Sequence, residues 1–345
     1  MSQRKREDSA QGSQSGTTVV MALFNGGGLT RFAIDSVFSQ TRLPRELIIV
    51  DDGSTDDSVA MIERFVTTHP SPVPVRVISQ SNSGQGAARN AGVAAATSEY
   101  IAFIDQDDTW PHDHIEILSE HLEGNARLGW VYSDFCQIDR AGAIVRHNVL
   151  AETKYTQPAD SVLSFLSQDL FMLPSASLIR SRAFTSVGGF DTQFRGYEDD
   201  DLFIRMLDDG WAFAFEPRPV TNYRVHLGNT SRNESFLRSR EKFFDKYQDE
   251  LVTNQESSAR FVSALSDRMT RAFLMDAISM HNTSASAEYK AELFRVARKV
   301  FASLGWTPKR RAVLLAIRSR FFLRSLLFAW FLSNPTARAN HNEIF

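Results

Sequence analysis

Leu47-Ile48-Ile49-Val50-Asp51-Asp52-Gly53-Ser54 joins a short apolar run to two acids and a turn. Apolar runs of this length that end in turn residues are typical of buried strands. A second run, Tyr100-Ile101-Ala102-Phe103-Ile104, ends in the same way at Asp105-Gln106-Asp107-Asp108. The two stretches predict buried strands that deliver carboxylates to one edge of a sheet.

The rest of the first two thirds of the chain repeats this alternation. Further apolar runs are Thr18–Phe24, Val75–Ser79 and Trp130–Phe135. Helical spacing lies between them, in a stripe of Val59, Ile62 and Val66 and in the segment from Ala87 to Ala96. Alternating strands and helices predict an α/β fold with a mainly parallel sheet covered on both faces. We expect Asp51 and Asp105 to face one crevice beyond the strand ends.

Composition excludes several classes of protein. The 345 residues are 43% hydrophobic and 23% charged, with a net charge of −3, which gives no indication of nucleic-acid binding. The single cysteine, Cys136, allows neither a disulfide framework nor a cysteine metal site, and it fits a reducing cytoplasm. Residues 1–16 are polar, so we expect a disordered tail and not a signal peptide or an anchor.

The sequence pattern changes near residue 235. Residues 17–232 carry the strand signals, whereas residues 233–345 are helical in pattern. The apolar stretch from Ala312 to Leu332 contains three arginines, too many for a spanning helix of about 20 nearly uncharged residues. Residues 309–332 therefore either lie on a membrane surface as a basic amphipathic helix or pack internally with a solvated basic face.

Asp105 and Asp107 have the spacing of a cation site. Residues two apart on extended backbone point the same way, and Mg²⁺ or Mn²⁺ prefers oxygen ligands and keeps substrate phosphates. The alternative is a solvated turn. Further along, Tyr223-Arg224-Val225-His226 offers a neutral imidazole that could complete a metal shell, although a lone histidine is more often a hydrogen-bonded surface residue.

The acids that follow the apolar run Leu47–Val50 suit a nucleotide. Asp51 and Asp52 can accept hydrogen bonds from a ribose or a base. The alternative is a helix cap formed by Ser54 or Thr55. The glycine-rich segment from Asn82 to Asn90 opens a helix and offers backbone N–H groups to phosphate, with Arg89 on the same face.

The last acidic run, Glu198-Asp199-Asp200-Asp201, precedes an amphipathic stretch. Four acids in a row repel one another and raise the pKa of at least one of them. A carboxylate with a raised pKa is a good general base for a hydroxyl group. The alternative is an acidic first helical turn that favours the positive helix end.

Taken together, these pieces resemble a family 2 glycosyltransferase of the GT-A fold, a Rossmann-like α/β architecture. The resemblance covers roughly residues 17–232. It rests on six motifs in order: Val19 to Gly27, Ala33 to Thr41, Asp51-Asp52-Gly53-Ser54, Gly84 with Ala88-Arg89-Asn90-x-Gly92, Asp105-x-Asp107, and Gly188-Gly189-Phe190-Asp191 with Tyr197-Glu198-Asp199.

The resemblance implies residue roles. The nucleotide and donor contacts would be Asn25, Asp51, Asp52, Gly84, Arg89 and Asp105. Asp107, with His226, would hold a divalent Mn²⁺ or Mg²⁺, and Asp199, paired with Glu198, would be the general base.

It also implies the reaction, an inverting, metal-dependent transfer from a UDP or dTDP sugar to a hydroxyl acceptor. The Gln-x-x-Arg-Trp signature of processive synthases is absent, so we expect single transfers to a glycan or lipid-linked glycan in polysaccharide or glycolipid assembly. Residues 233–345 would bind the acceptor or a membrane surface, at the cytoplasmic face.

Two alternatives stay open. One is a sugar-nucleotide nucleotidyltransferase, whose phosphate loop is loosely similar to Gly26-Gly27-Gly28-Leu29-Thr30-Arg31. That loop normally has a further glycine before the threonine, which is absent here. A nucleotide-binding relative without catalysis would need a broken D-x-D or a missing base, and the sequence retains both.

Overall fold

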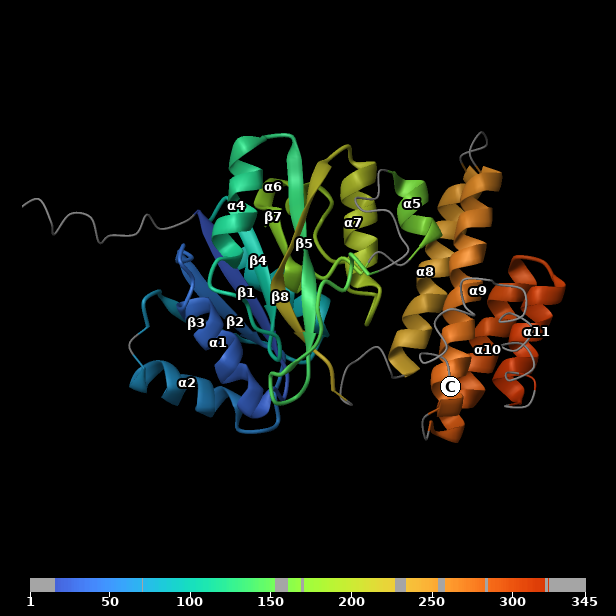
Figure 1. Ribbon diagram of the computed structural model, residues 1–345, viewed down its shortest axis with the longest axis horizontal. Coiled ribbons are helices and arrows are strands. Elements are labelled where there is room, and N and C mark those ends of the chain that lie inside the picture. The colour runs from blue at the N-terminus through green and yellow to red at the C-terminus, as the bar shows by residue number, and fades with distance from the viewer. Residues whose placement is uncertain are drawn as a thin grey trace, which may run out of the picture. The chain divides into compact units, whose positions relative to one another are not determined.

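The computed structural model describes residues 16–69, 71–152, 161–168, 171–226, 234–253, 258–282, 285–319 and 322 (Figure 1). The chain divides into two compact units. Unit 1 contains the sheet and the helices around it, and unit 2 contains α5 and the helices after residue 233. The tail predicted at residues 1–16 lies outside the described residues except for Gly16.

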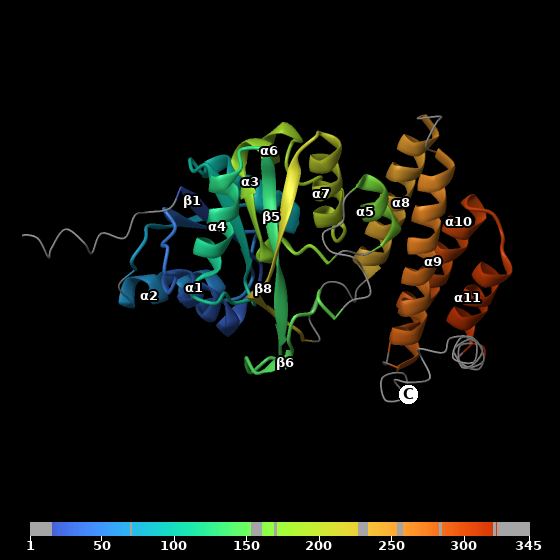
Figure 2. The same ribbon diagram turned by 45° about the horizontal axis from the view of Figure 1, so that its top comes forward.

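Unit 1 is built on an eight-stranded sheet with the order β3-β2-β1-β4-β7-β5-β6, in which β8 also pairs with β5. The strands are β1 (Thr17–Leu23), β2 (Glu46–Asp51), β3 (Val75–Ser79), β4 (Tyr100–Asp105), β5 (Leu128–Ile138), β6 (Ile144–Arg146), β7 (Ser177–Arg180) and β8 (Ala212–Arg224). β1 to β4 are parallel, β7 runs antiparallel to β4 and β5, and the long β5–β8 pair is parallel (Figure 2). The predicted mixed, mainly parallel sheet flanked by helices is confirmed.

The helices of unit 1 cover both faces of this sheet. They are η1 (Gly27–Leu29), α1 (Thr30–Phe38), α2 (Ser58–Thr68), α3 (Gln85–Ala95), α4 (His114–Gly124), η2 (Pro174–Ala176), α6 (Ser181–Ser186) and α7 (Glu198–Asp208). Alternate residues of β1 point to opposite faces, so Val19 and Met21 join the core under α1 and α4, whereas Val20 faces α3.

The expected cap of α2 is wrong. α2 begins at Ser58 with Asp57 at the N-cap, and not behind Ser54 or Thr55. Ser54 Oγ instead accepts a hydrogen bond from Asn25 N at 3.0 Å, and Thr55 N donates to Asn25 Oδ1 at 2.8 Å. The turn after β2 is therefore hydrogen-bonded to the turn after β1, and α2 begins only after this turn.

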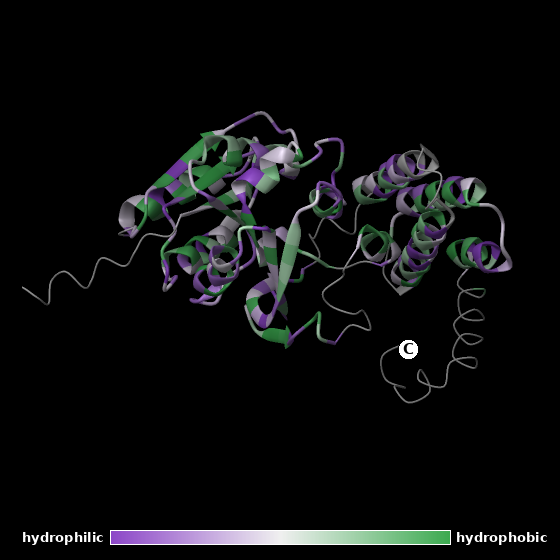
Figure 3. Cartoon of the chain, turned by 90° about the horizontal axis from the view of Figure 1, so that it is seen from above, coloured by the Kyte–Doolittle hydropathy of each residue, from purple (hydrophilic) through white to green (hydrophobic). Residues whose placement is uncertain are grey.

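Unit 2 is a helical bundle. Its helices are α5 (Val162–Ser167), α8 (Glu234–Thr253), α9 (Ser258–Asn282), α10 (Ala287–Ser303) and α11 (Pro308–Arg318). Each carries hydrophobic and hydrophilic residues in alternation (Figure 3), and the hydrophobic ones form the core. The buried residues of α11 are Val313, Leu314, Ala316 and Ile317.

The burial of that stripe bears on residues 309–332. Within their described part, the apolar side of α11 packs inside unit 2, as the internal-packing alternative holds. The remainder, residues 320–321 and 323–332, lies outside the described residues. No helix in the described ranges combines the length and the hydrophobicity needed to cross a bilayer.

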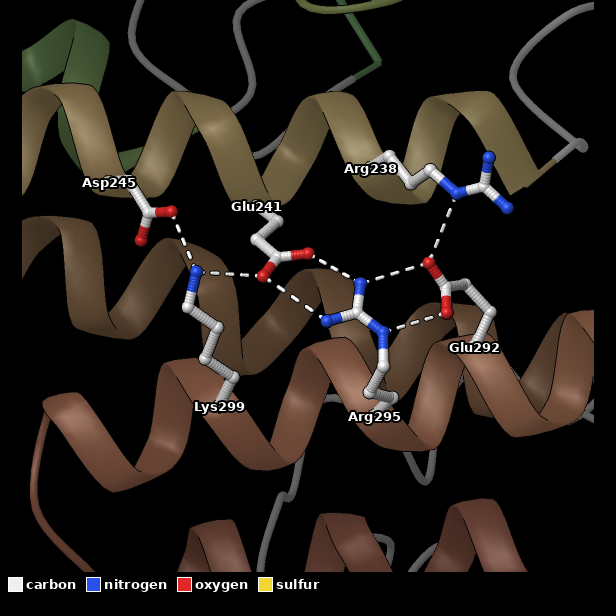
Figure 4. Close-up of polar contacts among 6 residues, drawn as sticks. All are labelled: Arg238, Glu241, Asp245, Glu292, Arg295 and Lys299. Carbon is white, nitrogen blue, oxygen red and sulfur yellow. Dashed lines mark hydrogen bonds and ion pairs between the residues drawn. The ribbon is translucent and has the colours of Figure 1, made fainter.

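α8 and α10 are joined by a row of ion pairs (Figure 4). Arg238, Glu241 and Asp245 of α8 face Glu292, Arg295 and Lys299 of α10. Arg295 Nη2 lies 2.6 Å from Glu241 Oε2, and Lys299 Nζ lies 2.8 Å from Asp245 Oδ2. The cationic side chains are about half exposed, so each pair contributes only about 0–1 kcal/mol, and the alternation of charge mainly fixes the helix register.

Gly92 lets α3 approach the sheet. A Cβ at this position would lie 2.4 Å from Val20 Cγ1 and 3.3 Å from Val50 Cγ2. We therefore expect Gly92→Ala to lower the free energy of unfolding by about 1–3 kcal/mol, the cost of overpacking a core. Urea unfolding followed by circular dichroism measures this change.

The matched control is Gly124→Ala, because nothing lies within 4 Å of a Cβ at the end of α4. It should leave the unfolding midpoint unchanged or slightly higher. Equal midpoints for the two variants would contradict the close approach of α3.

Candidate active site

The carboxyl ends of β1, β2 and β4 lie side by side and bring together the first two acidic loops. Asp51 pairs with Leu23 in the β1–β2 register, and Asp105 pairs with Ala22 in the β1–β4 register. The two acids thus lie one strand to either side of β1, although more than fifty residues separate them in the sequence.

Asp52 is held by the loop that follows β3. Its Oδ1 accepts hydrogen bonds from Gln80 Nε2 at 2.7 Å and Ser83 N at 2.8 Å, and its Oδ2 accepts one from Gly84 N at 2.8 Å. Asp52 is buried, so it acts as an anchor for the start of α3. The N–H groups of Ser83 and Gly84, expected to cradle phosphate, are directed at this carboxylate instead.

Asp51 keeps capacity for a ligand. Its Oδ1 accepts a hydrogen bond from Ser54 N at 2.9 Å, and among the described residues its other oxygen has no donor. Asn25 has a φ of 49°. Its side-chain oxygen accepts hydrogen bonds from the backbone of the turn after β2 and so positions this loop.

An exposed aromatic ring completes this corner, and the sequence analysis missed it. Phe24 follows β1 with 43% of its surface exposed. Gln106 Oε1 accepts a hydrogen bond from Phe24 N at 2.9 Å, and Gln106 Nε2 donates to Phe24 O at 3.1 Å. The signal that could have found it is an aromatic residue placed where a buried strand ends.

Arg89 is an internal partner of two acidic loops. It is only 3% exposed, and its Nη2 lies 2.6 Å from Asp105 Oδ1, while Nη1 lies 3.9 Å from Glu198 Oε1. Gln85 Nε2 also donates to Asp105 Oδ1 at 3.0 Å. Burial lowers the pKa of Arg89, but the two acids outweigh it and raise the pKa. Arg89 thus links β4 to α7, and its contact with the donor stays a prediction.

The rest of the Arg89-Asn90 motif binds the loop before α7. Asn90 Nδ2 donates to Phe190 O at 2.8 Å, and Phe190 N donates back to Asn90 Oδ1 at 2.9 Å. The Gly-Gly-Phe-Asp segment is therefore held against α3, which fixes where α7 begins.

Asp107 and His226 meet across 119 residues, with Asp107 Oδ2 and His226 Nε2 2.7 Å apart and both side chains about a quarter exposed. Burial and Asp105 raise the pKa of Asp107, whereas His226 lowers it. The carboxylate oxygens of Asp107 suit Mn²⁺ or Mg²⁺. The described residues contain no cluster of three or more potential metal-binding side chains, so a cation here would take its other ligands from the substrate.

Arg224 holds the two loops of this pair together, and the sequence analysis did not single it out. Its backbone N donates to Asp108 Oδ1 at 2.9 Å, and its Nε donates to Asp107 O at 2.7 Å. Asp108 is buried and also accepts a hydrogen bond from Ser175 Oγ at 2.8 Å, so it is an anchor. The end of β8 is therefore fastened to the D-x-D loop.

The last acidic run forms the first turn of α7, and its members have different partners. Glu198 Oε2 accepts a hydrogen bond from Gly196 N at 2.5 Å, and Asp201 pairs with Arg205 at 2.7 Å. Asp199 forms no ion pair with any described residue. Burial, then Asp200 and Glu198, raise the pKa of Asp199 well above its usual range, and Arg89 lowers it. An acidic helical turn and a candidate base are thus both present.

Comparison with known proteins identifies the region that holds these groups. The sequence profile described as "Glycosyl transferase family 2" matches residues 18–182. Residues 18–182 belong to glycosyl transferase family 2. This glycosyltransferase region spans β1 to the start of α6 and so includes Asp51, Arg89 and the D-x-D loop.

Relatives of the chain carry the same type of name. Glycosyltransferase GlyG of Streptococcus pneumoniae is 26% identical over 81% of this chain and 94% of its own. Three further curated relatives, 28–45% identical, are matched over only 27–34% of their own lengths, so the chain spans about a third of them.

Two solved structures share the fold. S. aureus TarS 1-349 in complex with UDP-GlcNAc has a TM-score of 0.62 at 14% identity, over 87% of this chain and 86% of that one. The mannosyltransferase PcManGT from Pyrobaculum calidifontis in complex with GDP-Man and Mn²⁺ has a TM-score of 0.52 at 18% identity, over 88% and 86%. The GT-A architecture expected from the sequence is confirmed.

The raised pKa of Asp199 gives the stability a pH dependence. Below the ordinary Asp pKa of about 3.9, the carboxyl is protonated in both the folded and unfolded states and has no effect. As pH rises, the unfolded chain releases this proton first, so the folded state loses stability until its own raised pKa is passed.

We therefore expect Asp199→Asn to melt at the wild-type temperature near pH 4 and at a higher temperature above pH 8. Thermal melts across that range measure the difference. The control is Asp208→Asn, which removes an exposed carboxylate from the other end of α7 and should show no such pH-dependent gain. A lower melting temperature for Asp199→Asn at pH 8 would contradict the assignment.

Proposed function

We propose that this protein transfers a single sugar, with inversion at the anomeric carbon, from a UDP or dTDP sugar to a hydroxyl group of a glycan acceptor. The observation that carries the proposal is the placement of Asp199, a carboxyl with a raised pKa, on a helix linked through Arg89 to the D-x-D loop. A candidate base and a candidate donor site thereby belong to one connected structure.

The donor would bind at the ends of β1, β2 and β4. Phe24 offers a ring face to the nucleoside base, and the available oxygen of Asp51 accepts a hydrogen bond from the base or ribose. Asp105 keeps its second oxygen toward the ribose while Arg89 holds the first. The UDP-GlcNAc bound by the neighbour TarS supports a uridine diphosphate sugar as the first donor to test.

Asp107 and His226 would hold a divalent cation at the donor diphosphate. Such a cation neutralises the charge that develops on the departing nucleoside diphosphate. Because the two side chains already lie within hydrogen-bond distance, little rearrangement is needed for both to face one ion. The Mn²⁺ complex of the neighbour PcManGT supports Mn²⁺ as the first ion to test.

Asp199 would act on the acceptor. Its carboxylate takes the proton of the acceptor hydroxyl as that oxygen forms a bond to the sugar C1. The bond between C1 and the diphosphate oxygen breaks on the opposite side, so the configuration at C1 inverts and the electron pair leaves with the nucleoside diphosphate. Because burial raises the pKa of Asp199, the rate should rise with pH as this carboxyl ionises.

The acceptor would be a glycan or a lipid-linked glycan in polysaccharide or glycolipid assembly, reached at the cytoplasmic face of a membrane. Unit 2 would serve this end by membrane contact within residues 309–332. The names of relatives such as GlyG support transfer to a glycan but do not define the sugar.

The nucleotidyltransferase alternative gains no support from the structure. Its phosphate loop would fall on Gly26 to Arg31, but Gly27–Leu29 form a 3₁₀ turn and the Thr30 side chain is completely buried. A relative without catalysis remains the alternative that the experiments below separate.

The donor site predicts metal-dependent nucleotide binding. UDP or dTDP with Mn²⁺ should raise the melting temperature, because a ligand that binds only the folded state stabilises it. The rise in melting temperature should need the metal and disappear in Asp107→Ala, which removes one of the two side chains proposed to hold the cation. A thermal-shift panel of UDP, dTDP and GDP with and without Mn²⁺ tests this, and no shift with any nucleotide would contradict the proposal.

The base predicts loss of turnover without loss of donor binding. Asp199→Asn should lower kcat for donor hydrolysis or transfer by about 10²–10⁴-fold, the usual contribution of a positioned general base, while the UDP shift survives. Asp208→Asn should retain the wild-type rate. Full activity of Asp199→Asn would contradict the assignment of Asp199 as the general base. Nucleotide binding without turnover in the wild type would favour the alternative of a relative without catalysis.

A further inference from the structure

The C-terminal part of the sequence has a one-sided charge. Between Glu292 and Glu343 the chain has no acidic residue, although its overall net charge is −3. The basic residues in this interval are Arg295, Arg298, Lys299, Lys309, Arg310, Arg311, Arg318, Arg320, Arg324 and Arg338. A segment with this composition is attracted to an anionic surface.

Part of this charge is used inside unit 2. Arg295 and Lys299 are paired with acids of α8 (Figure 4), and Arg310 donates to Leu304 O at 2.6 Å. In contrast, Lys309, Arg311 and Arg318 are exposed and form no ion pair with any described residue. Of the described exposed cations in this interval without an ion pair, Arg298 lies on α10 and these three lie on α11.

These cations share α11 with exposed apolar groups. Arg311, Leu315 and Arg318 are spaced four and three residues apart, which places them on one side of the helix. Leu315 and Trp306 are each 43% exposed, and Phe322 is 46% exposed. We call Arg311, Leu315 and Arg318, together with Trp306 before the helix and Phe322 after it, the α11 outer face.

The opposite side of α11 is closed. Val313, Leu314, Ala316 and Ile317 are buried in the bundle. His281 Nε2 also lies 2.8 Å from Ala316 O, which ties α11 to α9. The apolar stripe of this helix cannot enter a bilayer without opening unit 2, so any contact with lipid has to use the outer face.

We propose that the α11 outer face docks on the surface of a bilayer that contains anionic lipid, while unit 2 stays folded. Cations without an acidic partner, such as Arg311 and Arg318, attract anionic headgroups, although Arg318 also lies over the ring of Phe294 at 4.8 Å. Trp306 and Leu315 add groups that favour the boundary between headgroups and acyl chains, which a purely electrostatic partner such as a nucleic acid would not need. This inference rests on the proposed function for its purpose, since it would bring the transferase to a lipid-linked acceptor.

The test uses the full-length protein and sedimentation with vesicles of phosphatidylcholine alone or mixed with phosphatidylglycerol. Wild type should bind the mixed vesicles, bind phosphatidylcholine at least tenfold more weakly, and be released by high salt, because salt screens exposed charges. The double variant Arg311→Glu/Arg318→Glu should lose at least tenfold in partition coefficient, and Leu315→Ser should weaken binding at high lipid with little change in salt dependence.

The matched control is Arg260→Glu/Lys290→Glu, which makes the same change in net charge at exposed positions of α9 and α10. It should keep at least half of the wild-type binding. Equal losses in the two double variants, no binding of wild type to mixed vesicles, or binding to heparin without binding to vesicles would each overturn the proposal.

The UDP shift separates this inference from the proposed function. All vesicle variants should keep the wild-type melting temperature and nucleotide response, since unit 1 is untouched. If UDP does not raise the melting temperature but vesicle binding is intact, only the transferase proposal is contradicted. If UDP raises the melting temperature normally but the protein does not bind vesicles, only the docking proposal is contradicted.

Discussion

One buried guanidinium organises the candidate active site of unit 1. Arg89 lies between the rings of Phe103 and Phe190, with centroids 5.9 Å and 5.3 Å away, and shares its charge between Asp105 and Glu198. Removing one member of a buried ion pair typically costs about 3–5 kcal/mol, because the partner charge stays buried without compensation. The end of β4 and the start of α7 are therefore held at a fixed separation, which is what a transfer between two bound substrates requires.

The acids around this centre divide into two groups by their hydrogen-bond partners. Asp52 and Asp108 are almost fully buried and bonded on both oxygens, so they shape loops. Asp51, Asp107 and Asp199 retain exposure or an oxygen without a donor, so they are the ones left for ligands and chemistry. The same residue type thus provides both the framework and the reactive groups, and only the local partners distinguish them.

The sequence predicted the elements better than the contacts. β3 has the predicted bounds, and β2 and β4 each end one residue beyond the predicted apolar runs, because buried apolar runs and turn residues are local signals. The loops with Asp51 and Asp105 were placed correctly because parallel strands end at one edge. The role of Arg89, the anchoring by Arg224 and the engagement of Gly84 depend on partners distant in sequence or on backbone donors, which no local pattern encodes. The cap of α2 failed for the same reason, since Asn25 holds Ser54 and Thr55.

Unit 2 is not a simple C-terminal appendage, because α5 belongs to it. Phe165 and Leu166 are buried, and Arg268 Nη1 of α9 donates to Phe165 O at 2.9 Å. During synthesis on the ribosome, α5 emerges long before the helices that cover it. Its apolar side therefore stays exposed to solvent while the rest of unit 1 is synthesised. A fragment cut before α8 would keep that side permanently bare and would be prone to aggregate. Domain dissection of this protein therefore has to remove α5 together with the C-terminal helices.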